Sequence, residues 1–475
     1  MLPIHRRTFL ATVTAATAGF AFPAINVRAA TPTFPDLVAM PATVPLIGDK
    51  GPATDVWGYN GQVPGPELRL KQGEQLRIKV RNDLKEPTTI HWHGIRADST
   101  MDGVPFLSQR PIEPGETFTY DFPVKDAGTF WYHPHVNNSE QVGRGLAGAL
   151  IVEEPDPITV DHDLVWVIDD WRLAQDASIV PFGNMMNASH GGRLGNVPTL
   201  NGLLTDDFKV RAGERIRLRL INVANARNFA LSFTGHNPWQ IAIDGHPVVP
   251  RQINQEPVIV TPGGRVDLVL DMTGKPGESH AITDGYYQRS TYTFTTLKYS
   301  DEPPLRAAVQ APPKRLADNP VALPDIKNAI LHEMDFQGGA MGGLAAARFK
   351  GETVGLRELA GMGMVWAVNG EVIPHMTAED IGKPMLTLKR GQTYRLRWRN
   401  STAFAHPIHL HGHSFHVIAQ NGKLIGQPVI QDTVLIQPDD WVDVAFVADN
   451  PGDWALHCHV LEHADSGMMG FVRVA

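Results

Sequence analysis

Four pairs of histidines, each with one residue between the two imidazoles, stand out in the sequence. The pairs are His91 and His93, His133 and His135, His409 and His411, and His457 and His459. On a β-strand, residues i and i+2 point to the same face, so each pair projects two imidazoles together. One such pair could be structural core histidines. Eight buried imidazoles without a metal would leave many ring nitrogens unpaired, so the set indicates a metal centre.

The only cysteine among the 475 residues, Cys458, lies between two of these histidines. On a strand its side chain points away from its neighbours, so the thiolate and the imidazoles serve different metal sites. His463 follows the cysteine by five residues, Met468 follows it by ten, and His406 lies three before His409. Two histidines, a cysteine and a weak axial methionine form the blue-copper electron-transfer site. Zinc is the rival, but it favours four closed ligands without a thioether.

The elements that must position these residues repeat along the chain. One pattern, a glycine followed by alternating apolar and polar residues, occurs as "KQGEQLRIKVRND", "RAGERIRLRLINV" and "KRGQTYRLRWRNS". A second pattern follows each copy, as "EPGETFTYDFPVKDAGTFWYHPH", "TPGGRVDLVLDMTGKPGESHAI" and "QPDDWVDVAFVADNPGDWALHCH". The period of two predicts half-buried β-strands.

The histidine pairs recur at the same offsets in the first and third copies. Asn82 and Asn400 are each followed nine and eleven residues later by a pair, and Pro114 and Pro438 by a pair at 19 and 21. The second copy has leucine, phenylalanine, alanine and threonine at those places. Structural histidines do not explain such a recurrence and loss, so the pattern favours metal binding by the first and third copies only.

Three copies predict three consecutive β-sandwich domains, and 44 glycines and 37 prolines suit an all-β chain with many turns. No helical period runs longer than a few turns, so we expect helices only as short connectors. The expected organisation is domain 1 at 31–157, domain 2 without metal ligands at 158–305, a proline-rich linker at 306–325 and domain 3 at 326–475.

Residues 1–30 have the features of an export signal. Arg6 and Arg7 precede a weakly apolar run that ends in small residues, and the paired arginines resemble the twin-arginine class, which exports folded proteins. An ordinary secretory signal is the alternative. The apolar run is too short to span a bilayer, so we expect a periplasmic or exported protein without a stable membrane anchor. A net charge of −8 with no basic stripe argues against nucleic-acid binding.

The ligand motifs together resemble those of the multicopper oxidases, in their three-domain laccase-like branch. They stand as "HWHG", "HPH", "HPIHLHGH" and "HCHVLEHADSGMM", and the resemblance covers essentially the whole chain after the signal. It implies three cupredoxin-like Greek-key domains and four coppers per chain. The type-1 copper would take His406, Cys458, His463 and Met468. The type-2 copper would take His91 and His409, and the two type-3 coppers would take His93, His133 and His459, and His135, His411 and His457. Met469 is the competing axial ligand, at a less suitable offset.

The resemblance also implies an oxidoreductase that uses O2 as electron acceptor. A reducing substrate would give single electrons to the type-1 copper through an exposed edge of His463. Electrons would then pass through Cys458 to His457 and His459, where O2 is reduced to water.

Protons for that reduction need an acidic group near the cluster. Asp102 matches the family's acidic residue, with a turn aspartate as the alternative interpretation. Many relatives also carry a glutamate directly after the type-1 histidine, where this chain has Ala464. Glu462 and Asp465 are the candidates to replace it, and a different second proton route is the alternative.

The reducing substrate has two main candidates: phenols and aromatic amines, as in laccases, or Cu(I), as in copper-defence oxidases. Methionines at 334, 341, 362 and 364, in and just before a glycine-rich segment at 337–364, suit Cu(I), although an incidental flexible loop explains them as well. Thr402 and Phe404 stand where cuprous oxidases use Asp and Met, which favours the laccase-like reaction. Some exported relatives are copper-free structural or cell-division proteins, but those have lost the histidines that this chain retains.

Overall fold

The structure is a computed structural model that describes residues 34–48, 51–204, 207–307, 310–373 and 383–475. The expected export signal at 1–30 lies outside the described residues. Within them the four α-helices have five or six residues each, which confirms that helices serve as short connectors: α1 (Asn138–Gly143), α2 (Met185–Ser189), α3 (Leu356–Gly361) and α4 (Leu461–Asp465). None of the described helices has the length and apolarity that a membrane span requires.

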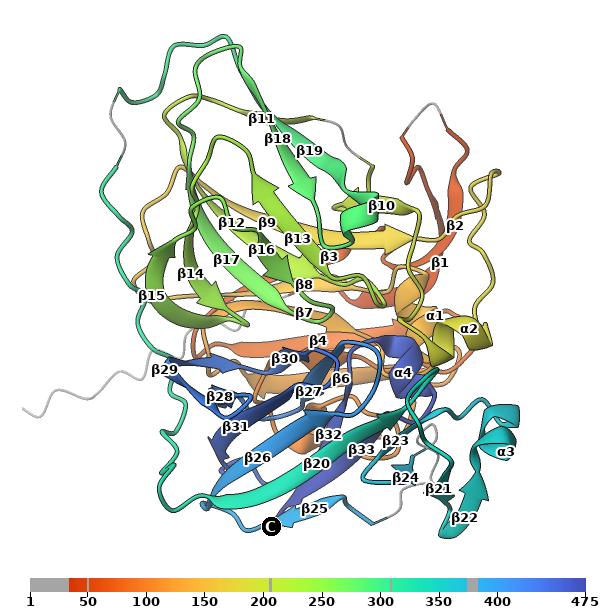
Figure 1. Cartoon of the computed structure of the whole chain (residues 1–475). Coiled ribbons are helices and arrows are strands. Elements are labelled where there is room, and N and C mark those ends of the chain that lie inside the picture. The colour runs from red at the N-terminus through yellow and green to blue at the C-terminus, as the bar shows by residue number, and fades with distance from the viewer. Residues whose placement is uncertain (1–33, 49–50, 205–206, 308–309, 374–382) are drawn as a thin grey trace, which may run out of the picture. The chain divides into compact units, whose positions relative to one another are not determined.

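Strands between residues 37 and 153 form two four-stranded sheets, which we call the first sandwich (Figure 1). They are β1 (Leu37–Val44), β2 (Thr54–Tyr59), β3 (Gly65–Lys71), β4 (Gln75–Asn82), β5 (His91–His93), β6 (Thr117–Pro123), β7 (Gly128–His133) and β8 (Gly148–Glu153). The sheet orders are β2-β1-β4-β6 and β3-β8-β7-β5. One buried cluster takes apolar residues from both sheets, among them Ile78 of β4 and Leu150 of β8, so the sheets share a core.

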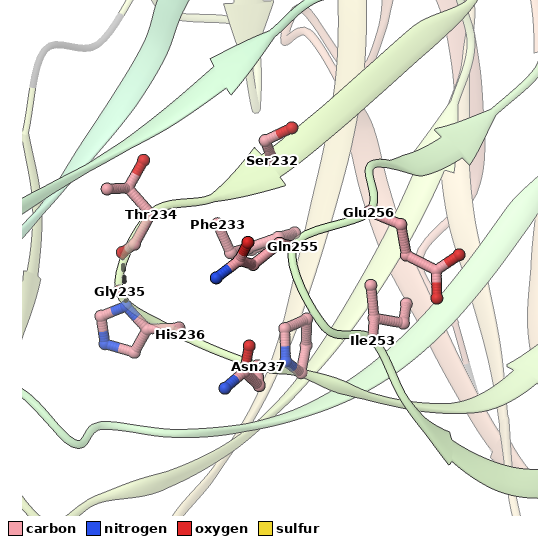
Figure 2. Close-up of a pocket in the computed structure, with 10 residues that line it drawn as sticks. Ser232, Phe233, Thr234, Gly235, His236, Asn237, Ile253, Gln255 and Glu256 are labelled. Atoms are coloured by element: carbon pink, nitrogen blue, oxygen red, sulfur yellow. Dashed lines mark hydrogen bonds between the residues drawn. The ribbon is translucent and has the colours of Figure 1, made fainter.

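Strands between residues 162 and 299 form the second sandwich, with a six-stranded and a five-stranded sheet. They are β9 (His162–Trp171), β10 (Val197–Leu200), β11 (Asp207–Val210), β12 (Arg215–Asn222), β13 (Phe229–Phe233), β14 (Trp239–Ile243), β15 (His246–Gln252), β16 (Val258–Val260), β17 (Arg265–Asp271), β18 (Ser279–Asp284) and β19 (Tyr292–Tyr299). The orders are β10-β9-β12-β17-β14-β15 and β11-β19-β18-β13-β16. The turn after β13 and the loop before β16 border a surface pocket of about 410 Å³ that is lined by His236 and Glu256, among others (Figure 2).

Strands between residues 330 and 474 form the third sandwich, with sheets of nine and five strands. They are β20 (Ile330–Gly338), β21 (Ala346–Phe349), β22 (Glu352–Gly355), β23 (Trp366–Val368), β24 (Glu371–Val372), β25 (Leu386–Leu388), β26 (Thr393–Asn400), β27 (His406–Leu410), β28 (Phe415–Gln420), β29 (Lys423–Gln431), β30 (Thr433–Ile436), β31 (Trp441–Val447), β32 (Gly452–Cys458) and β33 (Met469–Val474). The orders are β22-β21-β24-β23-β20-β26-β31-β28-β29 and β25-β33-β32-β27-β30. The expected all-β fold class is therefore confirmed.

The predicted alternation of buried and exposed residues holds in β4 and β26 but is wrong for β12, which is buried at every position. Two of its three arginines contact the first sandwich or the residue directly after it. Arg217 donates to Glu154 at 2.6 and 2.9 Å, and Arg219 donates to Thr129 at 3.0 Å. Glu154 neutralises Arg217. Asp163 and Asp267 neutralise Arg219, so the polar face of this strand is an internal contact and not a solvent face.

The described part of the expected linker, residues 306–325, contains neither helix nor strand. Asn319 attaches it to the first and second sandwiches. Its side chain accepts from the backbone nitrogen of Ala127 and donates to the carbonyl of the same residue, both at 2.8 Å, and donates to the Gly245 carbonyl at 3.2 Å. The linker is therefore fixed in place by a paired side-chain contact.

The glycine- and methionine-containing segment at 337–364 has regular structure for much of its length. It contains the β21–β22 hairpin and α3, so the flexible-loop interpretation is wrong for that part. Its methionines differ in environment, since Met364 is buried whereas Met341 and Met362 are exposed. Only the exposed two could meet a substrate directly.

Candidate metal centres

Strand pairing explains how histidines far apart in sequence meet. β5 pairs antiparallel with β7 so that His91 lies opposite His133, and β27 pairs with β32 so that His409 lies opposite His457. The other member of each pair lies two residues along the same chain segment. The structure brings all eight imidazoles into one buried cluster, with contacts between rings of the first and third sandwiches.

Three imidazoles of this cluster direct their Nε2 atoms at one another, and in His411 and His457 these atoms are bare lone pairs. His457 Nε2 lies 3.1 Å from His411 Nε2 and 3.4 Å from His135 Nε2. The opposite nitrogens are donors, because His457 Nδ1 donates to the Cys458 carbonyl at 2.9 Å and His411 Nδ1 donates to Asp102 Oδ2 at 2.8 Å. A neutral imidazole that donates at Nδ1 has only a lone pair at Nε2.

Burial keeps these rings neutral. It lowers the pKa of His457 to about 3 and the pKa values of His135 and His411 well below the usual value, with repulsion from neighbouring imidazoles adding to the effect. Two lone pairs at 3.1 Å repel each other unless a cation lies between them. The donor set therefore fits a bound metal ion.

A second group consists of His93, His133 and His459, with ring centroids 5.0 to 5.8 Å apart. His133 Nδ1 donates to the Pro134 carbonyl at 2.8 Å, which leaves its Nε2 without a partner. His93 is turned the other way, since its Nε2 lies 3.1 Å from Asp432 Oδ1 and its Nδ1 is the unpaired atom. In the described structure neither ring nitrogen of His459 has a hydrogen-bond partner. These free nitrogens are available to a metal.

The remaining pair, His91 and His409, has the same arrangement. His91 Nδ1 donates to the Asp102 carbonyl at 2.9 Å and His409 Nδ1 to the Asp432 carbonyl at 2.8 Å, so each Nε2 is left unpaired. Ligand atoms of both lie within 4.8 Å of each other and of His411. An oxygen acceptor that fixes one nitrogen while the other stays free is the usual environment of a metal-binding histidine.

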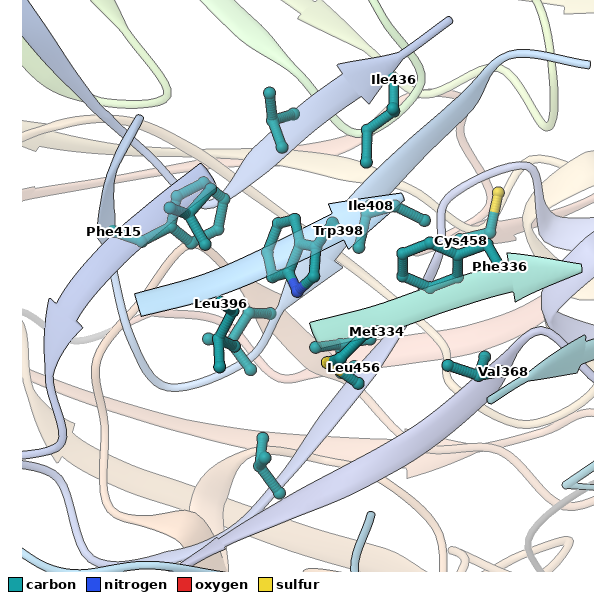
Figure 3. Packing of buried hydrophobic residues seen from close by; sticks show 14 of the residues in the cluster. Met334, Phe336, Val368, Leu396, Trp398, Ile408, Phe415, Ile436, Leu456 and Cys458 are labelled. Carbon is teal, nitrogen blue, oxygen red and sulfur yellow. The ribbon is translucent and has the colours of Figure 1, made fainter. Parts of the chain in front are cut away.

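The cysteine site lies apart from these imidazoles, at the edge of the apolar core of the third sandwich (Figure 3). Cys458 Sγ is 3.4 Å from His406 Nδ1 and 3.7 Å from His463 Nδ1, and the two nitrogens are 3.1 Å apart. Met468 belongs to the same buried cluster, and its carbonyl accepts from the Cys458 backbone nitrogen at 3.1 Å. Met469 packs in a different cluster. The structure thus brings Met468 and not Met469 to the core that contains the thiol.

The prediction that His463 has an exposed edge is wrong. The side chain is 0% exposed, and its Nε2 donates to the backbone carbonyl of His190 at 2.5 Å. His190 follows α2 and belongs to the second sandwich, which carries no metal-ligand motif of its own. A segment from another sandwich therefore covers the imidazole, a contact that no local sequence pattern encodes.

His236 shows what a buried histidine without a metal looks like in this chain. Its Nδ1 lies 3.0 Å from the Thr234 carbonyl (Figure 2). Its Nε2 lies 2.6 Å from the Tyr299 hydroxyl, so both ring nitrogens have protein partners. The pocket that it lines contains none of the predicted site residues. His413 and His416 each leave one Nε2 unpaired as well, but among the described residues only the eight-histidine cluster gathers several such nitrogens in one place.

Asp432 and Arg265 are site residues that sequence reasoning missed. Asp432 contacts two cluster histidines, His93 through its side chain and His409 through its carbonyl. Arg265 of β17 is fully buried and donates to both Asp432 carboxylate oxygens at 2.8 and 2.5 Å. The sequence contains one indication that Arg265 has a special role. Arg265 stands where the other two repeats have the uncharged residues Thr117 and Trp441.

The acidic residues near the cluster differ in what they contact. Asp102 is buried, and it accepts from His91 through its backbone carbonyl and from His411 through its carboxylate. Glu462 instead accepts from the Asn225 side chain at 2.9 Å and from a backbone nitrogen of the second sandwich. Asp465 accepts from the Ser139 backbone nitrogen at 3.0 Å.

Comparison with known proteins agrees with this geometry. Family models described as multicopper oxidase match residues 43–157, 159–302 and 361–475. The chain is 29% identical to the multicopper oxidase MmcO of Mycobacterium tuberculosis over 91% of this chain and 85% of that protein. It is 28% identical to Laccase-3 of Thanatephorus cucumeris over 89% of this chain and 87% of the laccase.

Solved structures of similar proteins have the same fold. A multi-copper oxidase from Pseudomonas thermotolerans is 36% identical with a TM-score of 0.81, over 93% of this chain and 98% of that one. A Campylobacter jejuni multicopper oxidase, described as a metallo-oxidase, is 28% identical with a TM-score of 0.75, over 92% of this chain and 90% of that one. The chain therefore belongs to the multicopper oxidase family, copper-dependent oxidoreductases of cupredoxin-like domains that use O2 as electron acceptor.

Proposed function

We propose that this multicopper oxidase holds four coppers and oxidises phenols and aromatic amines one electron at a time while reducing O2 to water. The observation that carries the proposal is the convergence of unpaired donor atoms at two separate places, the eight-histidine cluster and the cysteine site. Copper bound there would supply the electron acceptors that collect single electrons and deliver four of them to O2. The proposed assignment keeps the ligand sets implied by the sequence motifs.

The protein holds these ligand atoms in protonation states that favour metal binding. The imidazoles are already neutral, so they need not lose a proton before they bind a cation. Burial raises the pKa of the Cys458 thiol, so it releases its proton only when a cation is present to stabilise the thiolate. A short covalent path joins the cysteine site to the eight-histidine cluster, because Cys458 is directly followed and preceded by His459 and His457.

Asp102 is proposed to hold protons for O2 reduction. Asp102→Asn should keep the contact to His411 Nδ1 through the amide oxygen but can no longer carry a proton. We expect O2-dependent reoxidation to slow by roughly a hundredfold, within the range for loss of a general acid, while anaerobic reduction of the blue site changes little. Stopped-flow absorbance measures both steps. Asp121→Asn, on an exposed part of β6, is the control, and equal reoxidation rates in wild type and Asp102→Asn would exclude the relay.

A second candidate donor, Cu(I), is favoured by the exposed methionines. Met185, Met186, Met341 and Met362 are 40%, 62%, 81% and 44% exposed, and thioethers are soft ligands that suit Cu(I). Ala340, next to Met341, donates its backbone nitrogen to the Ser189 carbonyl at 2.7 Å, so α2 and this loop are neighbours. The Campylobacter relative is described as a metallo-oxidase, whereas others are laccases.

Export through the twin-arginine machinery into the periplasm is also proposed, on the basis of Arg6, Arg7 and the short apolar run that follows. That route carries folded proteins. It would deliver the sandwiches with their imidazoles already assembled.

The test of the proposed function is the metal content of the purified protein. We expect about four coppers per chain and the intense blue absorption of a cysteine-ligated copper. O2 consumption is then measured with a simple phenol and with Cu(I) side by side. Zinc as the only bound metal, or a copper-loaded but colourless protein, would contradict the proposal, and faster turnover of Cu(I) would make the second donor the physiological one.

A further inference from the structure

The segment that covers His463 is bound to the third sandwich by three consecutive peptide carbonyls. We call residues 184–192 the lid. The carbonyl of Ala188 accepts from Trp366 Nε1 at 2.6 Å, that of Ser189 accepts from the Ala340 backbone nitrogen at 2.7 Å, and that of His190 accepts from His463 Nε2 at 2.5 Å. All three donors belong to the third sandwich. Such a run of contacts is a built interface and not an incidental loop position.

The lid and Trp366 together close off the His463 imidazole. The Trp366 ring is fully buried and lies 4.3 Å from the His463 ring, centroid to centroid. His190 itself packs against Phe404, with ring centroids 5.7 Å apart. An aromatic donor in solution therefore has no face or edge of the type-1 histidine to touch while the lid is closed.

A glycine permits the close approach of the lid to the residues around α4. Gly192 has a φ of +82°, and a Cβ there would lie 2.4 Å from Ala226 Cβ and 2.5 Å from Val460 Cγ1. Just beyond it, the backbone nitrogen of Arg193 donates to Glu462 at 3.2 Å. The end of the lid is thus held against α4, the helix that carries His463.

We propose that the lid determines donor specificity by excluding bulky aromatic donors from contact with His463. Small donors transfer their electron across the hydrogen bond between the His190 carbonyl and His463, whereas a large phenol waits until the lid opens. Each donor loses one electron to the type-1 site, and a phenol also releases its hydroxyl proton to water. The inference rests on the proposed type-1 site at His406, Cys458 and His463.

Trp366→Phe tests the lid because it keeps a ring beside His463 and removes the donor to the Ala188 carbonyl. Loss of one buried hydrogen bond shifts an opening equilibrium by about fivefold. We therefore expect the ratio of kcat/KM for a two-ring phenol, syringaldazine, to that for ferrocyanide to rise about fivefold. Using the ratio cancels any common change in the copper site. Hydrogen–deuterium exchange of residues 184–192 should accelerate by a similar factor.

Trp398→Phe is the matched control. Trp398 is also fully buried in the third sandwich, and its Nε1 has no hydrogen-bond partner in the described structure, so the same substitution breaks no contact to the lid. A second variant replaces residues 184–189 with Gly-Ser-Gly and should raise the ratio further. If faster exchange leaves the donor ratio unchanged in both variants, the lid does not set specificity. A wild-type protein without the blue band would instead overturn the proposed type-1 site.

Discussion

Cys458→Ser is expected to abolish the blue colour and the oxidation of every donor, while copper bound by the eight-histidine cluster remains. Serine has neither the soft sulfur nor the readily ionised group that a blue-copper site requires. His406 and His463 alone, with Nδ1 atoms 3.1 Å apart, would form a weaker and colourless site. The copper content should fall by about one ion per chain, and turnover should fall to background.

Metal analysis, the visible spectrum and O2 consumption check this expectation together. Ala455→Ser is the control, since it places the same hydroxyl in β32 at another fully buried position. Persistent turnover in the Cys458 variant would show that electrons reach the cluster by a path that does not involve the cysteine.

Arg265→Met should destabilise the protein strongly and disturb the eight-histidine cluster. Arg265 belongs to the second sandwich, which contributes no proposed metal ligand. Burial alone would raise the pKa of Asp432, but the Arg265 guanidinium more than offsets this effect and holds that pKa well below its usual value. Removing the cation leaves a buried carboxylate uncompensated, which costs about 3–5 kcal/mol of unfolding free energy. The carboxylate that holds His93 Nε2 would then protonate or move.

The expected signature is a lowered denaturation midpoint together with an altered type-2 copper EPR signal and reduced cluster copper, while the blue band persists. Arg265→Lys should restore part of the stability, because it keeps the charge but not the bidentate geometry. Arg251→Met is the control. Arg251 is an exposed arginine of β15 that pairs with Glu256, and such surface pairs contribute at most about 1 kcal/mol. A variant with wild-type stability and an unchanged EPR signal would exclude Arg265 as a positioning residue.

Much of the site was predictable because it is encoded locally. Strand periodicity places His457 and Cys458 on opposite faces, and the repeat offsets identify which histidines correspond, without any knowledge of three-dimensional contacts. The fold class follows from the same alternation. These features depend on residues close together in sequence, where spacing and geometry are directly related.

Contacts between sandwiches were not predictable from these patterns. The second copy appeared to have no part in metal binding, yet Arg265 fixes Asp432 and the His190 carbonyl covers His463. Likewise, the alternation in β12 predicts exposed arginines, and the structure buries them against Glu154. In each case the deciding partner is a side chain or carbonyl far away in sequence, which periodicity within one strand cannot specify.

The buried arginines of β12 and β17 give the ligand-free repeat a structural role. Arg217 of the middle repeat pairs with Glu154, and Arg265 of the same repeat pairs with Asp432 of the third sandwich. The middle repeat thus supplies counter-ions to the first and third sandwiches, although none of the proposed metal ligands belongs to it. Without this repeat, Glu154 and Asp432 would lose Arg217 and Arg265, the arginines that pair with them.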